Sequence, residues 1–197
     1  MRPPKRPKRA TENELAHVSE YAVRNTAFFL AGLALLMVQA NVFRLLNVIH
    51  APLFIPSLLL PLILFMGVHE YSLVRGASVA FMLGYATDLI GIAPVGLYTF
   101  TYVAIFILGR AAGVRLVAQT KLMQVVLALA FTFVHTVMIL VLIAIFGRSA
   151  YVPRALLSLA LPHVLATGLV APVIFALAEW LHSATTTSRP HAGGAAS

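Results

Sequence analysis

The side chains that could do acid, base or metal chemistry are few, and long apolar runs surround them. "HEYSL" at 69–73 begins like the zinc-protease motif H-E-x-x-H, but Leu73 stands where the second histidine ligand is required. His135 and His163 lie in the last two apolar runs. If they face each other they could relay protons or bind a metal, and the favoured alternative is a neutral histidine hydrogen-bonded between helices.

Other catalytic signatures are missing from the sequence. It contains no G-x-S-x-G elbow, P-loop or G-x-G-x-x-G, and it has no cysteine for a thiolate site or a disulfide. Gly109 and Gly113 form a weak G-x-x-x-G, which predicts close packing inside the protein, with a dimer seam as the less favoured alternative. These absences agree with the prediction, given below from a family resemblance, of a protein that is not an enzyme and has no cofactor and no metal site.

One carboxylate, Asp88, stands out because it lies in the apolar stretch "GYATDLIGIAPVGLYTF". Gly76, Ala80, Gly84 and Asp88 recur at every fourth position, so they form one stripe along a helix. Small residues allow a neighbouring helix to approach closely, and an acid at mid-membrane costs about 2.5 to 3.5 kcal/mol on insertion scales. The stripe is therefore predicted to face protein rather than lipid.

A tight turn is predicted directly after Asp88. Gly91 and Gly96 would relieve backbone strain there, and Pro94 would fix φ. Residues at a similar depth are the candidate donors to the carboxylate: Tyr98, Thr101, and Gln39 or Arg44. Asp88 is then either a structural hydrogen-bond post, in which asparagine would keep much of the bonding and leucine would not, or a site that binds a ligand, ion or partner.

The composition identifies the environment of these residues. The chain has 197 residues, of which 60% are hydrophobic and 10% charged, and its mean hydropathy is +0.93. Such values are typical of an integral membrane protein, here an all-α, polytopic helix bundle. About six apolar runs approach the ~20 residues that a spanning helix needs. They are approximately 26–46, 53–68, 72–90, 96–114, 122–146 and 156–181.

Lysine and arginine positions predict the orientation, because cytoplasmic flanks carry the excess of these residues. Six spans with both termini in the cytoplasm place 11 of the 14 on the cytoplasmic side: Arg2, Lys5, Arg6, Lys8, Arg9, Arg24, Arg75, Arg110, Arg115, Lys121 and Arg189. The other three are Arg44, Arg148 and Arg154. A signal peptide cleaved after "VQA" is the less favoured alternative, because the apolar run continues beyond that point.

The chain divides into three parts. Residues 1–25 form a basic cytoplasmic arm with a short interfacial helix, for which Thr11 and Glu14 have capping-box spacing. Residues 26–182 form the transmembrane domain, and 183–197 are a small, polar tail of the kind that stays disordered. Beside apolar spans, the arm is predicted to bind anionic lipid headgroups rather than nucleic acid.

The stretch from Ala31 to Arg110 resembles the rod shape-determining MreD family. That family has a glutamine late in the first span, a glycine and an aspartate in the third, a proline-glycine turn, and a tyrosine-containing fourth span that ends in glycine-arginine. The matching residues here are Gln39, Gly84, Asp88, Pro94, Gly96, Tyr102 and Arg110, with Tyr98 just after the turn. This chain departs from the family at Ser57, where many members have an acid before the second span.

The resemblance implies a non-catalytic inner-membrane subunit of the bacterial elongation machinery. Its partners would be an MreC-like bitopic protein and, indirectly, an MreB-like actin homologue and the glycosyltransferase and transpeptidase that extend lateral peptidoglycan. The family's fold is thought similar to that of the substrate-binding subunits of energy-coupling-factor transporters. The alternative function is therefore a substrate-binding membrane subunit of a vitamin or small-molecule transporter.

Overall fold

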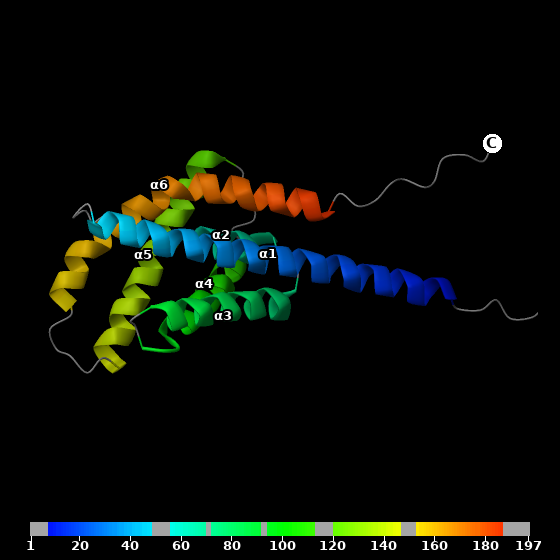
Figure 1. The fold of residues 1–197 in the computed structure, drawn as a ribbon, viewed down its shortest axis with the longest axis horizontal. Helices are drawn as coiled ribbons and strands as arrows, with labels where there is room; N and C mark the ends of the chain where they lie inside the picture. Colours follow the sequence, from blue (N-terminus) through cyan, green and yellow to red (C-terminus); the bar gives the residue numbers. More distant parts are fainter. Residues whose placement is uncertain are drawn as a thin grey trace, which may run out of the picture.

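The computed structural model describes residues 8–48, 56–69, 72–91, 94–112, 120–146 and 153–186. Within these ranges every regular element is a helix, in agreement with the predicted all-α class. The helices are α1 (Lys8–Val48), α2 (Leu59–His69), α3 (Leu73–Ile90), α4 (Leu97–Ala111), α5 (Lys121–Phe146) and α6 (Pro153–Thr186), shown in Figure 1.

Among the described residues, four segments are long and apolar enough to cross a membrane: Val23–Val42, Leu73–Ile90, Lys121–Phe146 and Ala160–Thr185. α2 has 11 residues and α4 has 15. At a rise of 1.5 Å per residue they measure about 17 and 23 Å, less than a hydrocarbon core of ~30 Å. Large apolar side chains are exposed on the outer surface, among them Leu122, Phe146 and Leu169. The chain is thus a multi-pass membrane protein, and the predicted count of six crossings is not confirmed.

The short helix α2 is the centre of the bundle. All residues from Leu59 to Val68 are buried, and α2 contacts each of the other five helices. The Phe65 ring lies 6.1 Å from the rings of Phe28 in α1 and Phe175 in α6, measured between centroids. A helix that is apolar on every side belongs in a protein interior. The helix begins at Leu59, so the second predicted run, approximately 53–68, starts before it, and its residues 53–55 lie outside the described residues.

Two glycines bring α2 and α4 together. A Cβ added to Gly67 would lie 3.0 Å from the Phe106 carbonyl oxygen, and one added to Gly109 would lie 2.9 Å from Leu64 Cδ1. Gly109 therefore packs inside the protein, as its G-x-x-x-G predicted, whereas Gly113 lies outside the described residues. Small residues are what such close helix contacts require.

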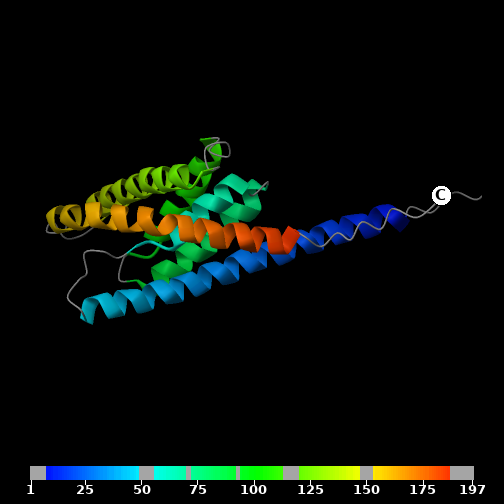
Figure 2. The same ribbon diagram turned by 90° about the horizontal axis from the view of Figure 1, so that it is seen from above.

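The first and last helices are longer than predicted. α1 has 41 residues and runs without interruption from Lys8 into the first apolar run, so a separate short interfacial helix that starts at Thr11 is wrong. α6 has 34 residues, contains Pro162 and Pro172, and changes direction along its length in Figure 1. α1 begins and α6 ends on the right in Figures 1 and 2, which we call the terminal end of the bundle; the opposite end is the distal end.

Candidate functional site

Asp88, in the last turn of α3, caps the start of α4 with its carboxylate. Its Oδ1 accepts a hydrogen bond from the Tyr98 backbone N–H at 2.9 Å. Its Oδ2 accepts from the Gly96 N–H at 2.9 Å and from the Thr99 N–H at 3.0 Å. The Thr99 hydroxyl donates to the same oxygen at 2.5 Å. The acid is 2% exposed, so these four donors replace water as its solvent.

Together with nearby carbonyls, Asp88 satisfies the N-terminus of α4. The Leu97 N–H donates to the Pro94 carbonyl at 3.2 Å, and the Phe100 N–H donates to the Gly96 carbonyl at 2.9 Å. The N–H groups of residues 96 to 100 are thus all hydrogen-bonded. A helix start normally leaves such groups without intrahelical partners, and its dipole favours a negative charge. The arrangement explains electrostatically how an acid is tolerated inside an apolar bundle.

The predicted stripe of small residues positions this cap. Gly76, Ala80, Gly84 and Asp88 are all buried, so the prediction that the stripe faces protein is confirmed. A Cβ on Gly84 would lie 2.6 Å from Thr99 Cα and 2.9 Å from Thr99 N, both of them backbone atoms of α4. The missing side chain at Gly84 is what lets the α4 backbone reach the carboxylate one turn further along α3.

The predicted donors to Asp88 were only partly right. Tyr98 does donate, but through its backbone N–H. The Thr101 hydroxyl donates to the carbonyls of Leu97 and Tyr98, and Arg44 is exposed. Gln39 has another task, because its Oε1 accepts from the Leu58 N–H at 3.0 Å and so caps the start of α2.

Sequence reasoning missed Gly96 and Thr99 as donors. A usable signal was present: glycine precedes α4 where a capping side chain usually stands, so the helix start needed an acceptor from elsewhere. The donors also define the expected effect of asparagine. With its amide oxygen at the Oδ2 position, asparagine would keep the bonds from the Gly96 N–H and from the Thr99 N–H and hydroxyl, while its NH₂ group would face the Tyr98 N–H and lose that bond.

The other predicted turn and motif residues play mixed roles. Gly96 has φ = 100°, in the left-handed region that favours glycine, as expected. Gly91 has φ = −78° and ψ = 171°, a conformation open to any residue, so its predicted role in relieving strain is wrong. Pro94 is exposed and supplies a carbonyl to the turn. Arg110 lies in the last turn of α4, where a cation complements the helix dipole.

A second polar group lies beside the first, on the other side of α4. His135 of α5 is 2% exposed, and its ring stacks on Tyr102 with centroids 5.4 Å apart and planes at 21°. The Tyr98 ring is 6.3 Å away, again between centroids. The predicted interhelical hydrogen bond of His135 is wrong, because neither ring nitrogen has a partner, although His163 of α6 lies nearby.

Ser57, at the approach to α2, is 3% exposed, and its side chain lies beside the buried hydroxyl of Tyr102 in α4. Its backbone N–H donates to Thr167 Oγ1 of α6 at 2.9 Å. Among the described residues, no group of three or more His, Cys, Asp or Glu side chains could hold a metal ion. His135 is therefore the interior polar side chain whose two ring nitrogens have no hydrogen-bond partner in the part of the chain that the structure describes.

Comparison of the chain with protein-family models, with curated proteins and with solved structures gives no match.

Proposed function

We propose that the chain is a non-catalytic inner-membrane subunit of the bacterial cell-shape machinery, which scaffolds lateral peptidoglycan synthesis as MreD-family proteins do. One observation carries the proposal. Asp88, in the aspartate-turn-glycine block that is the most specific part of the resemblance, accepts four hydrogen bonds from the turn and the first turn of α4. An acid used in this way builds a rigid α3–α4 hairpin, which suits a protein that acts by holding partners.

The proposed topology has six crossings and cytoplasmic termini, with α2 and α4 as the short crossings inside the bundle. Two observations support it: 11 of the 14 lysines and arginines fall on one side, and α1 begins and α6 ends at the same end of the bundle. Reporter fusions after Val95 and after Ser197 should then report opposite sides of the membrane. A periplasmic C-terminus would refute this topology.

The proposed partners are an MreC-like bitopic protein and, through it, an MreB-like actin homologue and the elongation glycosyltransferase and transpeptidase. Anionic lipids would bind the arm that contains Arg2, Lys5, Arg6, Lys8 and Arg9, because clustered cations gain about 1 kcal/mol each at an anionic surface. Replacing these five cations by glutamine should weaken binding to anionic vesicles and leave the helix content unchanged.

The test of function is rescue of rod shape. In a strain that lacks its own MreD-like gene, the chain should restore rod-shaped cells and co-purify with the MreC-like partner. Asp88→Leu, which breaks the hairpin, should do neither at matched expression, whereas the control Leu169→Ala on the exposed face of α6 should do both. A chain that is stably inserted but neither rescues shape nor binds the partner would overturn the proposal.

A specific observation favours a second candidate, a substrate-binding subunit similar in fold to those of energy-coupling-factor transporters. The two His135 ring nitrogens, which have no hydrogen-bond partner among the described residues, are the atoms with which a small polar ligand would bond. Such a subunit should retain a small molecule on purification, detectable by mass spectrometry of the denatured protein. Its loss in His135→Leu, with rod shape unaffected, would favour transport over scaffolding.

A further inference from the structure

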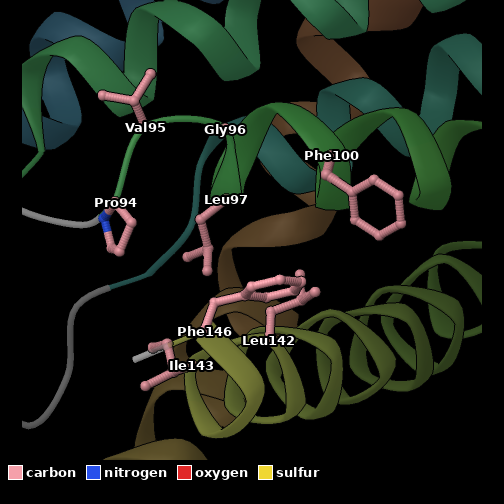
Figure 3. Close-up of a pocket in the computed structure, with 8 residues that line it drawn as sticks. All are labelled: Pro94, Val95, Gly96, Leu97, Phe100, Leu142, Ile143 and Phe146. Atoms are coloured by element: carbon pink, nitrogen blue, oxygen red, sulfur yellow. The ribbon is translucent and has the colours of Figure 1, made fainter. Parts of the chain in front are cut away.

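An apolar pocket of about 420 Å³ opens at the distal end of the bundle. One wall is the α3–α4 turn with the first turn of α4, and the other is the last turns of α5, as Figure 3 shows. Leu97 points from α4 toward Phe146 and Leu142 of α5 in this view. The main lining residues are Pro94, Leu97, Phe100, Leu142, Ile143 and Phe146.

The lining restricts the chemistry of an occupant. It contains no charged side chain, and the backbone N–H groups of residues 96 to 100 are already bonded to Asp88 or to local carbonyls. The start of α4 thus has no free donor for a phosphate or carboxylate, although helix starts often bind such groups. Only an apolar group would gain from entering.

The pocket faces the membrane rather than the protein interior. Its rim residues Val95, Phe100 and Phe146 are 69%, 58% and 73% exposed, and α5 is one of the four helices able to span the membrane. The rim therefore continues the apolar outer surface of the bundle.

We propose that this pocket binds the acyl chain of a phospholipid from the leaflet at the distal end. A partner's transmembrane helix is less suitable, because helices pack in membranes through small residues repeated over several turns. Here the walls extend over one to two turns and consist mainly of large, flexible side chains. The proposal holds whichever function the chain has.

Tryptophan quenching by a brominated phospholipid tests the proposal. Trp180 is the single tryptophan, so Trp180→Phe provides a silent background for one reporter at a time. Phe146→Trp places the reporter at the pocket, and Phe133→Trp is the control on the same helix, also largely exposed at 61%. In detergent, the lipid-to-protein ratio at half-quenching should be about tenfold lower for Phe146→Trp than for Phe133→Trp. This difference corresponds to a preference of the lipid for the pocket of about 1.4 kcal/mol. Equal half-quenching ratios would overturn the proposal.

Lipid retention gives an independent readout. Native mass spectrometry should find a phospholipid on the otherwise unmodified chain and on Leu169→Trp, which adds a tryptophan to an exposed position of α6. Leu142→Trp fills the pocket and should lose that lipid. Retention of the lipid by Leu142→Trp would refute the proposal. In the quenching experiment, a Phe146→Trp reporter that is shielded from lipid only when the protein dimerises would also refute it, because a second copy of the chain would then be the occupant.

Discussion

Two buried polar sites lie on either side of the first turns of α4, and they differ in how completely the chain satisfies them. At Asp88, four donors surround two carboxylate oxygens. At His135, two ring nitrogens have no partner, although Tyr98 takes part in both sites, through its N–H at the first and its ring at the second. The hydrogen bonding of the Asp88 carboxylate is thus complete, and that of the His135 imidazole is not.

The difference lies in the source of the partners. A helix start presents N–H groups whose positions the backbone fixes, so a single acid aimed at them obtains several donors at once. An imidazole needs one donor and one acceptor, and around His135 the neighbours are the aromatic rings of Tyr98 and Tyr102. An acid that accepts hydrogen bonds from backbone N–H groups therefore has a structural role. A buried imidazole without a hydrogen-bond partner marks the place where a bound ligand would supply one.

The largest effect is expected from removing the carboxylate. Asp88→Leu leaves the N–H groups of Gly96, Tyr98 and Thr99 without their acceptor, at about 1 to 3 kcal/mol for each. Asp88→Asn should be intermediate, because one of its two positions still accepts. In detergent, the unfolding temperature should be highest for the wild type, lower for Asp88→Asn and lowest for Asp88→Leu. If Leu unfolds at the wild-type temperature, the Asp88 site is not structural.

Gly84→Ala should destabilise next most strongly, by about 1 to 3 kcal/mol, because the new Cβ meets α4 backbone that cannot rotate away. Gly168→Ala is the matched control. Its Cβ would lie 2.4 Å from Leu129 Cδ2, an atom of a flexible side chain that can change rotamer. Unfolding temperatures of the two variants should differ clearly, and equal losses would mean that the close approach of α3 to α4 has no special cost.

Gly96→Ala should cost about 1 to 2 kcal/mol, the usual penalty of a left-handed conformation for a residue with a Cβ. Space is not the reason, since a Cβ there would meet nothing within 4 Å. Gly91→Ala is the control, because its φ of −78° suits alanine, and it should unfold near the wild-type temperature. A Gly91→Ala loss as large as that of Gly96→Ala would contradict this explanation.

The smallest effect, or a gain in stability, is expected for His135→Leu. Replacing a buried polar group that has no partner by an apolar one removes an unsatisfied group. Thr167→Val is the comparison, because Thr167 accepts the Ser57 N–H and its loss should destabilise. A marked loss of stability in His135→Leu would show that a bound molecule normally satisfies the imidazole, and the two sites would then be alike.

Sequence reasoning predicted the α3 stripe because its spacing is a local property of one helix. It did not predict the donors, because these are backbone groups of a turn whose position depends on how α3 and α4 pack. It likewise did not predict that α2 would be buried on every side at the centre of the bundle, since hydropathy measures how apolar a segment is and not what surrounds it. The prolines at 56 and 61 and the shortness of the run were the available warnings.

The position of α2 has a consequence for how the protein is made. Eleven residues are too few to remain stably inserted alone, and the helices that enclose α2 include α4, α5 and α6, which leave the ribosome after it. An early hairpin of α1 and α2 therefore lacks most of the native enclosure of α2, which is complete only when the last helix arrives. Truncated chains that lack α6 should consequently be degraded by membrane quality control, so that synthesis of the final helix commits the protein to its mature form.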